Sequence, residues 1–169
     1  MVPADFRTDR IGSALRGENP TVMRKLPASY AVLGDLQFLP GYSVLLVDRL
    51  GVSRLTDLDR PTRLTFLASM DLLGEAVQTA RQETMTGFRR MNLEILGNAD
   101  DFLHAHVWPR YDWEPPQRVT KPVWLYPSEF WTVPEPPPVS PDDPLRAAIE
   151  RHLDRLAAGP STRSAGERD

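Results

Sequence analysis

Apolar residues follow two distinct periods along this chain of 169 residues. After Asp59, apolar positions recur at spacings of four and three residues, at Phe66, Met70, Leu73, Val77 and Ala80. This spacing places them on one face of an α-helix, and Pro61 suits a first helical turn. The pattern predicts a long amphipathic helix that begins near Pro61.

Two further helices are predicted toward the ends of the chain. Residues 8–10 can cap a short helix that runs to Leu15. Near the other end, four apolar residues share helical spacing: Leu145, Ile149, Leu153 and Leu156. We therefore expect a second helix over 144–156, with Asp142 or Asp143 as its N-cap.

Four short segments have the pattern of β-strands. Runs rich in β-branched residues at 30–33 and 44–47 are separated by a loop, 34–41, that ends in Pro-Gly, which predicts an antiparallel hairpin. The segment 88–96 alternates imperfectly and is followed, after a short acidic turn, by 102–111. These two segments predict another hairpin.

The composition changes after the second hairpin. Residues 115–144 hold ten of the 17 prolines, and all four tryptophans lie between Trp108 and Trp131. So many prolines exclude a regular central strand, whereas dense aromatic residues are untypical of a disordered linker. We expect Trp124, Tyr126 and Trp131 to fix an irregular arm on the globule, with plain surface packing as the alternative role.

Length and charge restrict the class of protein. The chain suffices for one domain with an appended arm. A net charge of −3 with interspersed signs provides no basic field for a nucleic-acid polymer, and the absence of cysteine excludes disulfides and thiolate chemistry. No apolar run approaches the roughly 20 residues that span a bilayer, and the first residues lack a signal-segment pattern. A cytoplasmic protein without a membrane partner is expected.

Candidate chemistry is concentrated at His104 and His106, two of the three histidines. Alternate residues of a strand share a face, so both imidazoles can meet one ligand, and both titrate near neutral pH. Three readings are open for this pair: packing histidines, a metal site or a catalytic centre. A metal site needs a third or fourth ligand, for which Asp100, Asp101 and Asp112 lie nearby in sequence. His152 is expected to be solvated or capping.

The residues around the pair resemble a known family. The string 92–98, the acidic turn and 103–111 resemble the signature end of the histidine triad (HIT) superfamily, and 35–47 resembles its earlier Pro-Gly hairpin. The resemblance covers roughly 25–111 and is closest to bacterial members labelled diadenosine tetraphosphate hydrolases. It implies an α+β fold with helices packed on an antiparallel sheet.

The resemblance also implies a domain organisation. The HIT-like catalytic domain is expected over 1–114. The Pro/Trp-rich arm and C-terminal helix would follow over 115–158, and a disordered tail, rich in Gly, Ser, Arg and Glu, over 159–169.

The family motif is His-x-His-x-His, and alignment on Pro109-Arg110 places Phe102 at its first position. By this resemblance His104 is the nucleophile that forms a nucleotidyl-histidine, and His106 hydrogen-bonds the phosphate or leaving group. Because the first histidine mainly supports the loop through hydrogen bonding, Phe102 is the departure that bears most on activity.

A nucleotide-binding set is implied as well: Asp35, Leu36, Gln37, Asn92, Asn98 and Arg110. Asp35 would accept hydrogen bonds from ribose hydroxyls, Leu36 and Gln37 would lie near the base, and the remaining three would contact phosphates. Structural alternatives are an Asx turn at Asp35, closure of the hairpin at Asn98 and a rim salt bridge at Arg110.

The resemblance thus implies hydrolysis at the α-phosphate of dinucleoside polyphosphates or related nucleotide conjugates. A nucleotide-binding protein with little turnover is the alternative, and a metal-dependent hydrolase that uses both histidines as ligands is a third. No protein-bound metal or other cofactor is expected beyond magnesium carried by the substrate phosphates, and a homodimer is expected from the resemblance.

Overall fold

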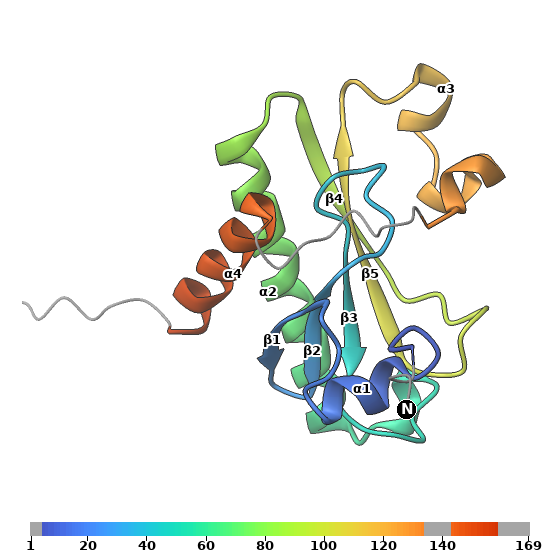
Figure 1. Cartoon of the computed structure of the whole chain (residues 1–169), viewed down its shortest axis with the longest axis vertical. Helices are drawn as coiled ribbons and strands as arrows, with labels where there is room; N and C mark the ends of the chain where they lie inside the picture. The colour runs from blue at the N-terminus through green and yellow to red at the C-terminus, as the bar shows by residue number, and fades with distance from the viewer. Residues whose placement is uncertain (1–4, 134–142, 159–169) are drawn as a thin grey trace, which may run out of the picture.

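A computed structural model describes residues 5–133 and 143–158, and Figure 1 shows how the elements are arranged. The five strands are β1 (Val22–Leu26), β2 (Ser29–Leu33), β3 (Ser43–Val47), β4 (Phe88–Glu94) and β5 (His104–Tyr111). The helices are α1 (Arg10–Leu15), α2 (Arg60–Thr84), α3 (Pro116–Val119) and α4 (Pro144–Ala157), with single 3-10 turns at η1 (Leu55–Asp57), η2 (Val123–Leu125) and η3 (Ser128–Trp131). The predicted tail at 159–169 lies outside the described residues.

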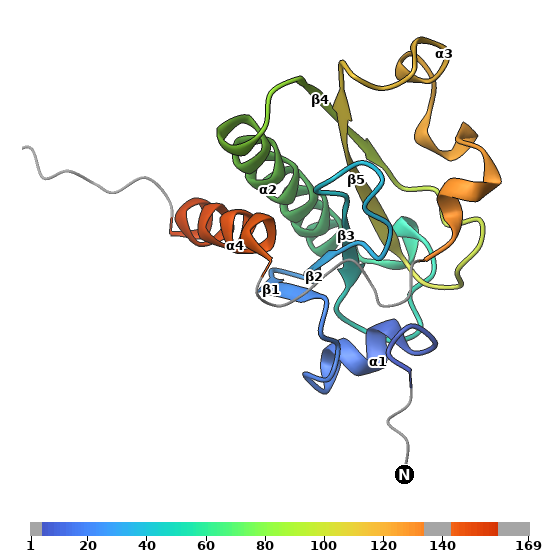
Figure 2. The same cartoon turned by 45° about the horizontal axis from the view of Figure 1, so that its top comes forward.

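The strands form one antiparallel sheet in the order β1-β2-β3-β5-β4. In Figure 2, α2 covers one face of the sheet and the arm that contains α3 lies on the other side. The expected α+β fold, an antiparallel sheet with packed helices, is confirmed. Because α2 separates the two hairpins in sequence, the pairing of β3 with β5 brings the loop before β3 beside the histidine strand.

The long helix α2 begins where the sequence predicts. The Asp59 carboxylate accepts a hydrogen bond from the Thr62 backbone amide at 2.8 Å, and Pro61 lies in the first turn. Phe66, Leu73 and Val77 are buried in the main core, so the apolar face is the one that covers the sheet.

Strand β1 is the element that periodicity did not predict. Its pairing with β2 contains a register shift between Val22 and Arg24. Met23 and Leu26 are both buried although they are three positions apart, a spacing that would put them on opposite faces of a regular strand. The bulge therefore breaks the alternation that would reveal a strand.

The arm packs on the sheet through a second hydrophobic cluster, which includes Trp108, Tyr111 and Tyr126. The Trp131 indole N–H donates to the Tyr126 carbonyl oxygen at 2.9 Å. Tyr126 and Trp131 therefore hold the arm as expected. The expectation for Trp124 is wrong, because this side chain is 54% exposed. Residues 134–142, part of the predicted arm, lie outside the described residues.

His152 also departs from expectation. The sequence favoured a solvated or capping histidine, but the side chain is buried in α4 and its Nε2 lies 2.8 Å from Glu83 Oε2 on α2. The histidine therefore joins α4 to α2.

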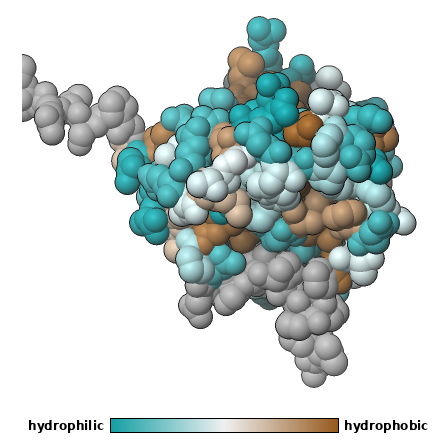
Figure 3. Space-filling view, turned by 90° about the horizontal axis from the view of Figure 1, so that it is seen from above, coloured by the Kyte–Doolittle hydropathy of each residue, from teal (hydrophilic) through white to brown (hydrophobic). Residues whose placement is uncertain are grey.

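The surface of the molecule mixes residue types. The face seen in Figure 3 shows hydrophobic residues interspersed among hydrophilic ones. Within residues 5–133 and 143–158, no helix combines the length and apolar character needed to cross a membrane.

Candidate active site

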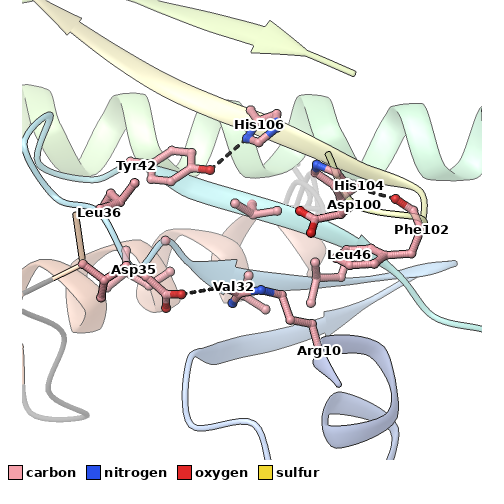
Figure 4. Close-up of a pocket in the computed structure, with 14 residues that line it drawn as sticks. Arg10, Val32, Asp35, Leu36, Tyr42, Leu46, Asp100, Phe102, His104 and His106 are labelled. Carbon is pink, nitrogen blue, oxygen red and sulfur yellow. Dashed lines mark hydrogen bonds and ion pairs between the residues drawn. The ribbon is translucent and has the colours of Figure 1, made fainter. Parts of the chain in front are cut away.

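Strand β5 carries both histidines of the motif on one face of the sheet, as the alternation predicts (Figure 4). Their ring centroids lie 4.8 Å apart, and the ring planes are nearly perpendicular at 83°. On the neighbouring strand β3, Leu46 is paired with His104 and Val44 with His106. Paired residues of neighbouring strands project to the same face, so Leu46 and Val44 are apolar neighbours beside the two imidazoles.

His104 has a defined protonation pattern. Its Nδ1 lies 2.9 Å from the backbone carbonyl oxygen of Phe102. Because a carbonyl oxygen can only accept, Nδ1 carries the hydrogen, and Nε2 of the neutral ring keeps its lone pair. The sequence alone does not identify this acceptor.

His106 is held neutral by its surroundings. Burial lowers its pKa from 6.5 to about 4, the nearby His104 adds to this effect, and Asp100 acts in the opposite direction. Its Nδ1 lies 2.8 Å from the Tyr42 hydroxyl oxygen. The site therefore holds a neutral His106 at neutral pH beside a His104 ring whose Nδ1 faces a carbonyl oxygen.

A pocket opens beside the two histidines, with about 580 Å³ of empty space including its open mouth. Its walls come from α1, the end of β2, the loop before β3, strand β3 and the turn before β5. The lining residues are Arg10, Val32, Leu33, Gly34, Asp35, Leu36, Tyr42, Val44, Leu46, Asp100, Phe102, His104, His106 and Val133.

Two members of the predicted binding set, Asp35 and Leu36, line this pocket. Asp35 is 8% exposed, and its Oδ2 lies 2.5 Å from Arg10 Nη2 and 3.7 Å from Arg7 Nε. The negative charge of this carboxylate is therefore compensated before any ligand binds. Asp100 also lines the pocket, and no ion pair to it is found among the described residues.

Gln37 has a different place from the one expected. Its side-chain amide donates to the carbonyl oxygens of Gly34 and Tyr42, and its Oε1 accepts from the Gly41 amide, each at 2.8 Å. These three bonds fix the loop that carries Tyr42, and Gln37 is absent from the lining of the pocket.

Arg110 is buried, and its guanidinium is bonded within the fold. It donates to the Glu114 carboxylate at 2.9 Å and to the carbonyl oxygens of Arg118 and Lys121 at 3.0 and 2.8 Å. Buried ion pairs of this kind are costly to break. The side chain therefore anchors the arm and does not reach the histidine pocket.

The two predicted asparagines also lie away from the histidine pocket. Asn92 is paired with Trp108 and lines a separate groove together with Arg89, Arg90 and Lys121. Asn98 is exposed in the loop between β4 and β5. The structure thus brings His104, His106, Asp35 and Leu36 together but not Gln37, Asn92, Asn98 or Arg110.

Sequence reasoning missed two polar residues of the pocket, Arg10 and Tyr42, and considered Asp100 only as a possible metal ligand. Tyr42 directly follows the Pro40-Gly41 turn, which is the signal that could have drawn attention to it. Arg10 comes from α1, and no sequence spacing relates it to Asp35.

Few side chains that could coordinate a metal ion lie near the two histidines. Within the parts of the chain that the structure describes, no group of three or more histidine and acidic side chains is arranged to hold a metal ion.

Comparison with known proteins gives a result at the level of structure only. No family model matches the sequence, and no curated protein matches it. Among solved structures, a histidine triad protein from Sinorhizobium meliloti is similar, with 19% identity and a TM-score of 0.60 over 88% of this chain and 94% of the other. The fold is that of the histidine triad proteins.

Two other solved structures are similar to this chain, one described as a nucleotide-binding protein and the other as zinc-bound. A hypothetical histidine triad nucleotide-binding protein from Sulfolobus tokodaii has 15% identity and a TM-score of 0.60 over 92% of this chain and 98% of the other. A zinc-bound histidine triad family protein from Mycobacterium smegmatis has 17% identity and a TM-score of 0.55 over 86% and 93%.

The depressed pKa of His106 predicts a pH-dependent stability. Between pH 6.5 and about 4 the unfolded chain binds more protons at this residue than the folded chain. The free energy of unfolding therefore falls as the pH is lowered through this window, by about 2–3 kcal/mol from His106. Urea denaturation of the wild type and of His106→Asn should show a smaller loss in the variant. Equal losses in both proteins would contradict the burial of a neutral His106.

Proposed function

We propose that the chain is a HIT superfamily enzyme that hydrolyses nucleotide conjugates at the α-phosphate through a nucleotidyl-His104 intermediate. The observation that carries the proposal is the hydrogen bond from His104 Nδ1 to the Phe102 carbonyl oxygen. In the neutral ring this bond places the hydrogen on Nδ1, so the lone pair is at Nε2 of a ring that lines the pocket, and this is the tautomer a nucleophilic imidazole requires.

The proposed reaction has two displacements. In the first, Nε2 of His104 attacks the α-phosphorus, a nitrogen–phosphorus bond forms, and the bond to the leaving group breaks with its electron pair. In the second, water attacks the same phosphorus, and its oxygen replaces His104, which returns to the neutral ring. The products are a nucleoside monophosphate and the protonated leaving group. His106 would donate to the phosphate oxygens as negative charge develops.

The presence of Phe102 in place of the first motif histidine is compatible with turnover. The atom that orients His104 is the backbone oxygen of residue 102, and every amino acid supplies that oxygen. The Phe102 ring packs against the nucleophile, with centroids 5.1 Å apart, so the apolar side chain keeps the imidazole in position. Loss of the first motif histidine therefore leaves the orientation of the nucleophile intact.

Asp35 and Leu36 are the proposed nucleoside contacts. Ribose hydroxyls would donate to the Asp35 carboxylate, which Arg10 already holds in place through Oδ2. Leu36 would pack against the base. Gln37, Asn92, Asn98 and Arg110 are not used in this proposal, because their positions lie outside the pocket.

The proposed substrates are dinucleoside polyphosphates or related nucleotide conjugates in the cytoplasm. No protein-bound metal takes part in the proposed steps, and magnesium would arrive with the substrate phosphates.

Trapping the intermediate tests the proposed function. We expect purified protein incubated with diadenosine tetraphosphate or adenosine phosphoramidate, then quenched without acid, to carry a nucleotidyl mass. Fragmentation should locate this mass on His104 rather than His106, and His104→Ala should lose product formation by a factor of at least about 10³. Nucleotide binding without any His104-dependent product would favour the binding protein, and an adduct on His106 would show that the motif alignment is wrong.

We expect the Asp100 carboxylate to affect which leaving group the proposed enzyme prefers. This carboxylate lines the pocket of the nucleophile, so it repels a polyphosphate leaving group more than a neutral amine. We expect Asp100→Asn to raise kcat/KM for diadenosine tetraphosphate, relative to adenosine phosphoramidate, about fivefold, the effect of roughly 1 kcal/mol of charge repulsion. Asp101→Asn is the matched control, because Asp101 bonds the Ser53 hydroxyl and does not line this pocket. An unchanged ratio in Asp100→Asn would refute the assignment.

The homodimer expected from the resemblance has a candidate surface at β4. This strand is at the end of the described sheet and pairs with β5 alone. An edge strand presents unpaired backbone groups to which a second copy can add its own strand. We predict that sedimentation velocity detects a dimer at micromolar concentration. A monomer at every concentration tested would remove the dimer from the proposal.

A further inference from the structure

Tyr42 places a phenol directly against the second histidine of the site. Its hydroxyl oxygen lies 2.8 Å from His106 Nδ1 (Figure 4). The side chain is 7% exposed, and it comes from the loop before β3, whereas His106 comes from β5. Two segments that are distant in sequence therefore meet at one ring nitrogen.

The direction of this hydrogen bond is inferred from the partners open to the Tyr42 hydroxyl. Burial raises the pKa of the Tyr42 phenol above its ordinary value, so the hydroxyl keeps its proton at neutral pH. Burial also keeps His106 neutral. Within the described part of the chain, the Tyr42 hydroxyl makes no hydrogen bond other than the one to His106. We therefore infer that the Tyr42 hydroxyl donates its hydrogen to His106 Nδ1.

We propose that Tyr42 is a positioning residue that holds His106 in the tautomer with hydrogen on Nε2. The two histidines then have opposite tautomers: His104 presents a lone pair at Nε2, and His106 presents an N–H. This inference rests on the proposed function, in which one ring attacks phosphorus and the other donates to phosphate oxygens. With the opposite tautomer, His106 would turn a lone pair toward those oxygens and repel them.

The surroundings of Tyr42 fix the position of its hydroxyl. The ring stacks on Trp108, with centroids 3.4 Å apart and planes within 6°. A Cβ atom at residue 34 would lie 2.2 Å from the Tyr42 ring, so Gly34 leaves the space that this ring occupies. Gln37 then bonds the Tyr42 carbonyl oxygen at 2.8 Å. Packing, space and backbone bonding thus aim the hydroxyl at His106.

Nitrogen-15 NMR of the histidine-labelled protein tests this proposal without any substrate. In the wild type we expect the His106 spectrum of an unprotonated Nδ1 and a protonated Nε2. Tyr42→Phe keeps the stacked ring but removes the donor, so the two tautomers should become mixed. The pKa of His106 should also rise, because a hydrogen bond that stabilised the neutral ring is lost.

Kinetics supply the second measurement. If the protein turns over either substrate, Tyr42→Phe should lower kcat about tenfold or more with little change in KM, because the second histidine loses its preferred tautomer. Tyr126→Phe is the matched control, since it removes a buried hydroxyl that bonds Glu114 instead of a histidine. This control should leave the His106 spectrum and kcat unchanged.

A wild-type His106 with hydrogen on Nδ1 would overturn the proposal, and so would a tautomer that Tyr42→Phe leaves unchanged. Neither result depends on catalysis. Failure of the proposed hydrolysis, by contrast, would appear as the absence of His104-dependent product from a protein with the expected His106 spectrum.

Discussion

The hydrogen bond from the His104 imidazole to the Phe102 carbonyl oxygen is the contact on which the proposed chemistry depends. It assigns the ring hydrogen to Nδ1 and leaves Nε2 free, and it uses a main-chain atom that no substitution at residue 102 removes. The pairing of β3 with β5 keeps this strand in place, with Leu46 beside His104 on the neighbouring strand. Phe102 lies in the turn before β5, and its neighbour Leu103 is bonded through its backbone to Val47 and Val52, so the proposed nucleophile is oriented before a substrate arrives.

The rest of the site is assembled around this strand from distant segments. The loop before β3 brings Asp35 and Tyr42, the short helix α1 brings Arg10, and the turn before β5 brings Asp100. The loop supplies two polar groups and the other two segments one each, and apolar residues of β2 and β3 line the rest of the pocket. Asp35 is already paired with Arg10, whereas no ion pair to Asp100 occurs in the described residues. The Asp100 carboxylate therefore lies beside the proposed nucleophile His104, and in the proposed reaction it bears on the choice of leaving group.

Most of the fold could be predicted from the sequence, because it depends on local patterns. Part of the site could not be predicted, because it depends on packing between distant segments. Periodicity located α2, α4 and the two hairpins, but the bulge in β1 interrupted the alternation that would have revealed this strand. Alternation placed His104 and His106 on one face. Sequence spacing could not show that the Arg110 guanidinium forms an ion pair with Glu114, nor that the Gln37 side chain is hydrogen-bonded to the backbone of its own loop. Both polar side chains were assigned to ligands because their internal partners become visible only in three dimensions.

The central claim is a covalent intermediate on His104, formed and broken at one phosphorus atom. The stereochemistry at that atom tests it most directly. A substrate with a chiral phosphorothioate at the α-position should be hydrolysed in isotopically labelled water, and the configuration of the product should be determined. Two successive displacements invert the phosphorus twice, so the account predicts overall retention of configuration. Overall inversion would show that water attacks the substrate directly and would contradict the nucleophilic role of His104.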